Sequence, residues 1–103
     1  MKKGVRPSAF AKAEIEYYLV RYESESASLR DRLWDDIEAV IDLISEYPSI
    51  GELVRRTRGP RASVPAATLF FVIYRERGDD LQIVALAHKR RKPTYWRPRL
   101  KFN

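Results

Sequence analysis

The fold is decided by residues 69–88, LFFVIYRERGDDLQIVALAH. A run rich in aromatic and β-branched residues, 69–76, and a strand-like apolar run, 81–88, flank the turn sequence Gly78-Asp79-Asp80. Such runs are typical of strands, and a glycine-containing turn between them is typical of an antiparallel hairpin. We therefore predict strands at 69–76 and 81–88, paired as a hairpin.

The first of these strands is apolar on both of its faces. Side chains alternate across a strand, so one face can be covered by helices while the other needs a different cover. The sequence leaves two explanations open: a central strand shielded by its neighbours and the C-terminal segment, or an apolar surface for a partner, which we slightly favour. The two sets are Leu69, Phe71 and Ile73, and Phe70, Val72 and Tyr74.

Two amphipathic helices are predicted in the first half of the chain. Ser8 is placed to cap the first, over 9–22, and the polar stretch 23–28 makes the turn. Ser28 begins a capping-box pattern for the second helix, which Pro48 ends. Because the turn is short, the helices should pack antiparallel. Their apolar stripes are Ala11, Ile15, Tyr18, Leu19 and Tyr22, and Leu29, Leu33, Ile37, Val40, Ile44 and Tyr47.

The remaining strands are short. Residues 2–6 are consistent with a strand ending at Pro7, and another strand lies within 53–64, where Pro60 blurs its limits. The predicted order is β-α-α-β-β-β. This is an α+β fold in which 1–103 form a single domain, with the helical hairpin packed on one face of a small antiparallel sheet.

Charge is unevenly distributed along the chain. The net charge is +6, yet residues 13–52 hold eleven acidic and three basic residues, a net −8, which leaves +14 elsewhere. The basic part of the molecule is suited to bind nucleic acid or an acidic protein.

The composition also bears on metal sites and location. There is no Cys and one His, so thiolate sites are excluded and no metal or cofactor is expected. With no apolar signal segment and no apolar run long enough to span a bilayer, we expect a cytoplasmic protein without membrane contact.

The C-terminal segment, 88–103, combines cations with aromatic rings and has no acidic residue. Cations attract a polyanion or an acidic surface over long range, and rings provide contact area. Two interpretations stay open: the segment is a binding surface, or Tyr95 and Trp96 pack against the core while the cations are solvated. The cations are Lys89, Arg90, Arg91, Lys92, Arg97, Arg99 and Lys101, and the rings are Tyr95, Trp96 and Phe102.

Candidates for catalysis are few. His88 is the one side chain that ordinarily titrates near neutral pH, but a lone His at a strand end is more often a structural hydrogen-bonding group. Tyr95 could transfer a proton only if nearby arginines strongly lowered its pKa. Asp35 and Asp36 are adjacent on a helix, so they point apart and are best explained as a solvated face. Catalysis by this chain alone is therefore poorly supported.

These elements together resemble the ParE toxins of the RelE/ParE superfamily, the toxins of type II toxin–antitoxin modules. The resemblance lies in the helical hairpin, YPSIG at 47–51, the strand hairpin, HKRRKP at 88–93, and Trp96. RelE-like members are ribosome-dependent mRNA endonucleases, whereas ParE-like members poison DNA gyrase. Phe71 and Trp96 lie where RelE-like enzymes have a basic residue and a tyrosine, which favours the ParE branch.

The resemblance implies a non-catalytic toxin that inhibits DNA gyrase, makes no sequence-specific contact with nucleic acid, and forms a hetero-oligomer with a ParD-like antitoxin. The alternatives are a RelE-like ribonuclease, in which Arg90 stabilises charge and His88 or Tyr95 moves protons, and a nucleic-acid-binding module. Residues expected to act on the target are Arg90, Arg91, Tyr95, Trp96, Arg97 and Arg99. Residues expected to bind the antitoxin are Tyr18, Tyr22, Leu33 and Ile37.

Overall fold

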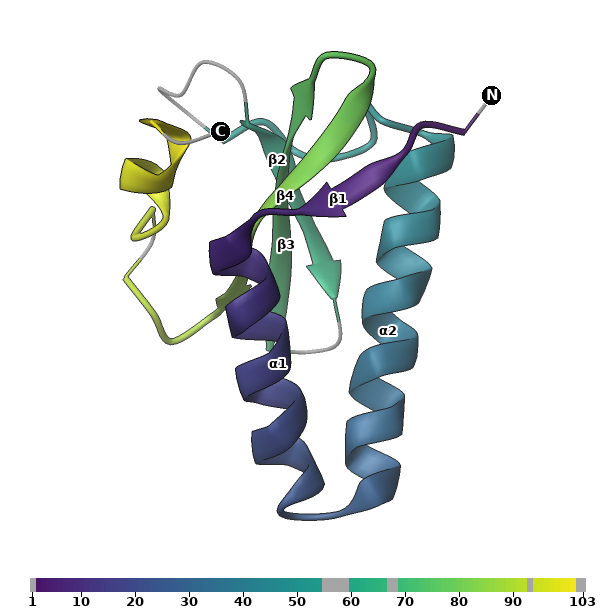
Figure 1. Ribbon diagram of the computed structural model, residues 1–103, viewed down its shortest axis with the longest axis vertical. Helices are drawn as coiled ribbons and strands as arrows, with labels where there is room; N and C mark the ends of the chain where they lie inside the picture. The colour runs from purple at the N-terminus through teal and green to yellow at the C-terminus, as the bar shows by residue number, and fades with distance from the viewer. Residues whose placement is uncertain (1, 55–59, 67–68, 93, 102–103) are drawn as a thin grey trace.

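The computed structural model describes residues 2–54, 69–92 and 94–101 and the backbone of 60–66. Two helices lie side by side and their connecting turn projects beyond the strands (Figure 1). The predicted order β-α-α-β-β-β is confirmed, with a short 3-10 helix added after the last strand. The elements are β1 (Val5–Pro7), α1 (Ala9–Glu23), α2 (Ala27–Glu46), β2 (Pro60–Ala66), β3 (Phe70–Arg77), β4 (Asp80–His88) and η1 (Arg97–Lys101).

The strands form one sheet in the order β1-β4-β3-β2. β3 and β4 are the predicted hairpin, and Gly78, the first residue of their turn, has a φ of +61°, a backbone conformation that glycine adopts readily. β2 is an edge strand, a position that tolerates Pro60 and Pro65. The prediction of a wholly antiparallel sheet is wrong, because β1 runs parallel to β4. No tight turn joins these two strands, and the long connection through both helices permits the parallel direction.

The second helix begins earlier than predicted. Ser26, not Ser28, is its N-cap, and its Oγ accepts a hydrogen bond from the Leu29 backbone N–H at 3.0 Å. The helix therefore starts at Ala27 and the turn is shorter than 23–28. The cap predicted for the first helix is confirmed, because Ser8 Oγ accepts a hydrogen bond from the Ala11 N–H at 3.1 Å.

The main core lies between the helices and the sheet. Most of the predicted stripe residues of both helices pack on one face of the hairpin, against Phe70, Val72 and Tyr74 of β3. Leu29 and Tyr47, at the two ends of the second predicted stripe, are instead 38% and 60% exposed. The Tyr74 hydroxyl donates to the Pro48 carbonyl at 2.8 Å and accepts from the Gly51 N–H at 3.0 Å. This buried side chain thereby ties the turn after α2 to the centre of the sheet.

The opposite face of the sheet is covered by the C-terminal segment. A second cluster joins Ile73 of β3 to Trp96 and to Val84, Ala85 and Ala87 of β4. The pairing of β3 with β4 shifts between Ile73 and Tyr74, which leaves Val84 as an extra residue in β4, so Val84 and Ala85 both join this cluster. The chain's own segment therefore buries Ile73 and partly covers Phe71, whereas Leu69, just before β3, is 40% exposed.

The position of the cap gives a stability prediction. Ser26→Ala should lower the free energy of unfolding by about 1 kcal/mol, because the first turn of α2 loses a capping acceptor. Ser28→Ala is the matched control and should change it by less than about 0.5 kcal/mol. Urea denaturation of both variants measures the difference. A larger loss in Ser28→Ala would place the cap where the sequence suggested.

Candidate functional site

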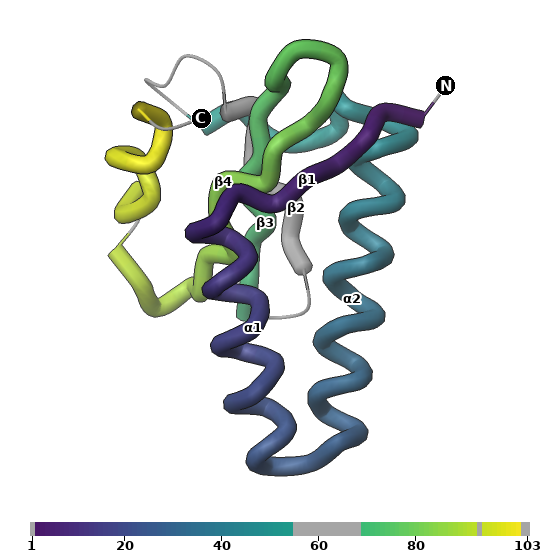
Figure 2. Tube along the Cα trace, in the orientation of Figure 1, coloured from purple at the N-terminus to yellow at the C-terminus, as the bar shows by residue number. Residues whose placement is uncertain are grey.

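The C-terminal segment follows β4 and runs beside the start of α1 (Figure 2). Lys89 N–H donates to the Leu69 carbonyl at 2.8 Å as the chain leaves the sheet. A series of turns then carries Tyr95 and Trp96 back over the sheet, and the Arg99 N–H donates to the Trp96 carbonyl at 2.9 Å. The segment is thus an integral part of the fold.

A carboxylate on α1 holds this segment in place. Arg99 donates from Nη1 to Glu14 Oε1 at 2.6 Å and from Nη2 to Oε2 at 2.9 Å. The Tyr95 hydroxyl donates to Oε2 as well. The two charged side chains are only 11% and 15% exposed, for Glu14 and Arg99 respectively. Two-point pairing of a guanidinium with a carboxylate is among the stronger hydrogen-bonded arrangements and also fixes orientation.

The same groups satisfy the open edge of β4. β1 pairs with β4 only as far as Ile83, and within the described part of the chain no strand pairs with the β4 backbone beyond that residue on this side. The Leu86 N–H donates to Glu14 Oε1 at 3.2 Å, and Arg99 Nη1 donates to the Val84 carbonyl at 3.1 Å. Side chains therefore replace the backbone bonds that a longer β1 would have made.

Arg75 is a second anchor for the segment. Its guanidinium is buried, and it donates from Nε to Gln82 Oε1 at 2.9 Å and from Nη1 to the Leu100 carbonyl at 3.1 Å. Burial, with a smaller effect from Arg77, lowers the pKa of Arg75. Its bonds to neutral oxygens fasten η1 to the sheet.

The residues predicted to act on the target divide into two groups. Trp96 is 3% exposed and belongs to the second core cluster, so it offers no contact surface. Tyr95 and Arg99 are occupied by Glu14. Arg91 is intermediate: its guanidinium lies 3.6 Å from the centre of the Tyr95 ring and 3.3 Å from Glu14 Oε2, but half of the side chain is exposed.

Besides the half-exposed Arg91, two predicted target residues lie on the surface. Arg90 and Arg97 are exposed, and the basic run that contains Arg90 continues through neighbouring exposed cations. We call Lys89, Arg90, Arg91 and Lys92 the basic loop. The exposure of these cations agrees with both interpretations of the segment, and its role in target binding stays a prediction. The sequence did not show that Glu14 would hold the segment in place. Glu14 is one of eleven acidic residues in 13–52, and nothing in the sequence distinguishes it from the others.

The residues predicted to bind an antitoxin lie mostly inside the molecule. Leu33 and Ile37 are buried against the sheet and cannot be contact surface in this fold. Tyr18 and Tyr22 are partly buried, and their rings pack on Phe70, with centroid distances of 4.8 and 6.0 Å. The error follows from assigning the one strong stripe of each helix to a partner, when that stripe forms the core.

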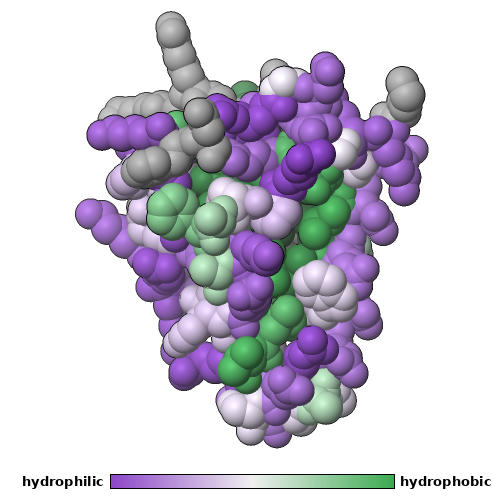
Figure 3. All heavy atoms as spheres, viewed as in Figure 1, coloured by the Kyte–Doolittle hydropathy of each residue, from purple (hydrophilic) through white to green (hydrophobic). Residues whose placement is uncertain are grey.

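The structure reveals a second apolar stripe on α1. Phe10, Tyr17 and Val20 are 44%, 58% and 67% exposed, and Ala13 is also exposed. Their spacing of three, four and three residues places them on one helix face, so the sequence contained this signal. Trp34 of α2 is also partly exposed. Figure 3 shows an apolar band that runs between the two helices.

The acid–base candidates are held in structural contacts. His88 Nδ1 accepts from the Arg90 N–H at 3.0 Å, and its ring stacks near Tyr18 at 5.8 Å between centroids, contacts that agree with the structural interpretation. Burial and, next, the hydrogen bond to Glu14 raise the pKa of Tyr95, and the smaller opposing effects of Arg99 and Arg91 do not reverse this. A phenol that moves protons near neutral pH would need the opposite shift.

Two further properties concern the described part of the chain. Within it, His, Asp and Glu side chains form no group of three that could hold a metal ion. None of its helices is long and apolar enough to cross a bilayer.

The fold of this chain is similar to that of a protein of known structure. No family model matches the sequence, and none of the curated proteins does. A solved structure described as the chromosomal ParDE toxin–antitoxin system from P. aeruginosa is similar, with a TM-score of 0.69 over 84% of this chain and 96% of that chain. The chain has a ParE-like fold. Sequence identity is 13%, so what the ParE-like chains share here is backbone architecture.

The Glu14 contacts generate a prediction for this ParE-like fold. Glu14→Gln should lower the free energy of unfolding by about 2–4 kcal/mol, because it leaves a largely buried Arg99 without its counter-charge. Glu16→Gln, an exposed site on the same helix, is the control and should cost less than about 0.5 kcal/mol. Denaturation gives the stability. Acrylamide quenching in a Trp34→Phe background should show Trp96 becoming more accessible in Glu14→Gln, and equal quenching in both variants would contradict the anchoring role.

Proposed function

We propose that the chain is the toxin of a type II toxin–antitoxin module, that it inhibits DNA gyrase, and that a ParD-like antitoxin neutralises it in the cytoplasm. The observation that carries this proposal is the ParE-like fold. The exposed basic loop and the structural engagement of His88 and Tyr95 support a toxin that binds its target without performing chemistry on it.

The proposed mode of action is stabilisation of gyrase in its DNA-cleaved state. A cationic surface speeds encounter with an acidic or nucleic-acid-bearing target, and complementary charge fixes the orientation of binding. Anchoring by Glu14 and Arg75 matters because the loop is then presented on a fixed support. A preorganised surface loses less conformational entropy when it binds. Arg90 and Arg97 would make direct contact, while Tyr95, Trp96 and Arg99 would position the segment.

The ribonuclease alternative has less support. It requires a group that transfers a proton, and the Tyr95 hydroxyl donates to Glu14 and has a raised pKa. It also benefits from a cation on β3, where this chain has Phe71, a half-buried ring below Lys89. Arg90 alone could stabilise charge. The third interpretation, a module that only binds nucleic acid through the basic loop, predicts neither gyrase inhibition nor mRNA cleavage.

A gyrase supercoiling assay and an mRNA-cleavage assay, with a gyrase-free DNA control, separate the gyrase inhibitor from the ribonuclease. Purified protein should inhibit supercoiling by gyrase and accumulate cleaved DNA, and it should leave mRNA on programmed ribosomes intact. Because the proposed action is stabilisation of a gyrase–DNA state, a DNA fragment without gyrase should remain uncut. Cleavage of ribosome-bound mRNA, with gyrase unaffected, would establish the ribonuclease function instead.

Charge reversal in the basic loop tests its role in toxicity. Arg90→Glu combined with Lys92→Glu should lower gyrase inhibition at least about tenfold, because like charges then face the target. Both side chains are exposed, so stability should change by less than about 0.5 kcal/mol per site. Lys12→Glu combined with Arg32→Glu makes the same change in net charge on exposed helix sites and should leave inhibition within about twofold. Equal losses in both pairs would show that only net charge matters.

The second stripe of α1 is the better candidate for antitoxin binding. Phe10 and Tyr17 line a shallow groove together with Glu14 and its two partners, Arg91 and Arg99. Half of the Arg91 side chain is exposed, so an apolar surface and an accessible cation are combined there. An amphipathic, acidic helix of the antitoxin would fit this combination, with apolar residues on the stripe and carboxylates near the arginines. Folding of such a tail on the toxin would bury the apolar surface that the isolated chain exposes.

Val20→Glu should separate toxicity from neutralisation. The substitution places a charge in the exposed stripe, so it should weaken antitoxin binding by at least about tenfold while the basic loop and gyrase inhibition are unchanged. Ala39→Glu, at an exposed site on α2, is the matched control. Growth during co-expression with the antitoxin provides the measurement: Val20→Glu should remain toxic and the control should be rescued. If co-expression of the antitoxin fully restored growth with both variants, the second stripe of α1 would be excluded as the antitoxin-binding surface.

A further inference from the structure

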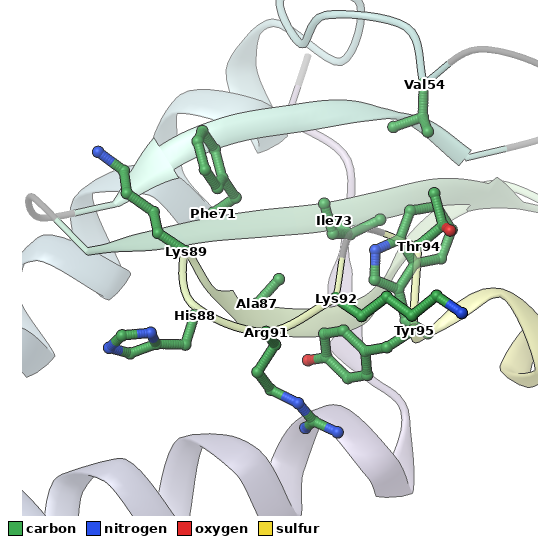
Figure 4. Close-up of a pocket in the computed structure, with 11 residues that line it drawn as sticks. Val54, Phe71, Ile73, Ala87, His88, Lys89, Arg91, Lys92, Thr94 and Tyr95 are labelled. Atoms are coloured by element: carbon green, nitrogen blue, oxygen red, sulfur yellow. The ribbon is translucent and has the colours of Figure 1, made fainter.

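A small pocket of about 200 Å³ lies between the sheet and the C-terminal segment. Its lining comes from β3, β4, the segment that follows β4, and Val54 (Figure 4). Phe71, Ile73, Ala87 and Trp96 give it an apolar floor. Ile73, Ala87 and Trp96 belong to the second core cluster, so the floor is part of the packed interior.

The walls of the pocket carry positive charge. Lys89, Arg91 and Lys92 line it, and no acidic side chain does so among the described residues. Arg91 is directed toward α1, where it meets Glu14. Lys89 lies beside Phe71, with Nζ 5.6 Å from the ring centre, and Lys92 lies beside Tyr95. Within the described residues neither lysine makes an ion pair, and both are exposed.

The wall beside Tyr95 is fixed by the fold. Thr94 has a φ of +66°, a conformation uncommon for a β-branched residue. Thr94 begins a turn in which the Arg97 N–H donates to its carbonyl at 2.9 Å. Within the same turn Trp96 is buried in the second core cluster and Tyr95 packs against it, so this wall is tied to the core beneath it.

Size and polarity together define the ligand class. A cavity of about 150 Å³ lined by apolar groups can hold benzene, so this pocket is large enough for one aromatic ring or a branched alkyl group. Apart from the cations, the polar side chains among its described lining are Thr94, His88, Tyr95 and Trp96, and the Tyr95 hydroxyl already donates to Glu14. A buried nucleobase would have most of its hydrogen-bonding edge unsatisfied here, which is costly. A ligand that is only a hydrocarbon would form no ion pair with Lys89 or Lys92.

We propose that this pocket binds a small organic anion, in which an aromatic ring or branched alkyl group carries a carboxylate. The apolar group occupies the floor formed by Phe71, Ile73, Ala87 and Trp96, and the carboxylate is held by Lys89 or Lys92. The proposal does not rest on the proposed gyrase inhibition. Because Lys89 and Lys92 belong to the basic loop, a bound anion would offset part of the charge of that loop and weaken its contacts with an acidic or nucleic-acid-bearing target.

Three matched probes test the ligand class: phenylacetate, its neutral analogue phenylacetamide, and acetate. Titrations of the ¹⁵N-labelled full chain, followed by ¹H–¹⁵N NMR, should show phenylacetate shifting the signals of Ala87, Lys89 and Trp96. Phenylacetate should bind about fivefold more tightly than phenylacetamide, the gain expected from one exposed ion pair. Acetate should give no saturable shift at this site. Equal binding of phenylacetate and phenylacetamide, or shifts located elsewhere, would overturn the proposal.

Two variants locate the binding site. Ala87→Leu fills the pocket and should weaken phenylacetate binding at least about tenfold, whereas Ala13→Leu on exposed α1 should not. Lys89→Gln with Lys92→Gln keeps the floor intact, so it should remove the preference for phenylacetate over phenylacetamide even if Ala87→Leu fails to fold. Uridine monophosphate is the final probe: tighter binding of this nucleotide at the same signals would reject the organic-anion class in favour of a nucleotide site.

Discussion

The open edge of β4 is the constraint on which the rest of the structure depends. β1 ends its pairing at Ile83, and the backbone beyond this point has polar groups that need partners. Glu14 accepts from the Leu86 N–H, and Arg99 donates to the Val84 carbonyl. The carboxylate and the guanidinium also bind each other, so one arrangement closes the edge and fastens the C-terminal segment. A chain end rich in cations, which would otherwise repel itself, is thereby folded against the sheet.

This anchoring separates the inner and outer sides of the segment. Trp96 fills the second core cluster, and Tyr95 and Arg99 face Glu14. Arg90 and Arg97 are left on the outside, together with the lysines of the basic loop. The aromatic residues therefore support the surface and the cations form it. The same division leaves the pocket between them, whose floor is core and whose walls are cationic.

Much of the fold could be predicted from the sequence because its signals are local. The strands at 70–77 and 80–88 and both helices follow from side-chain periodicity, and Gly78 marks the turn. The parallel direction of β1 could not be predicted, since it depends on how the long intervening chain, with both helices, β2 and β3, brings β4 beside β1. The cap at Ser26 was missed because three serines at 24, 26 and 28 offer similar local patterns. Which of the three serines caps the helix depends on the backbone geometry of the turn.

The candidate site was predicted less completely, for reasons that are also physical. A basic–aromatic segment is visible in the sequence, but whether Trp96 lies inside or outside depends on the bulge at Val84 and the uncovered face of β3. The role of Glu14 is wholly tertiary, because its partners lie more than 70 residues away. The outer stripe of α1 was visible at Phe10, Tyr17 and Val20, yet the stronger inner stripe was assigned to the partner.

The central claim, that Glu14 and Arg99 act as one unit to hold the C-terminal segment, is tested most directly by a double-mutant cycle. The free energies of unfolding of the wild type, Glu14→Gln, Arg99→Met and the double variant give the coupling energy of the pair. Because these side chains share a largely buried, two-point contact, we expect a coupling of at least about 2 kcal/mol. Additive effects, with a coupling below about 0.5 kcal/mol, would show that the two residues stabilise the protein independently and would contradict this account.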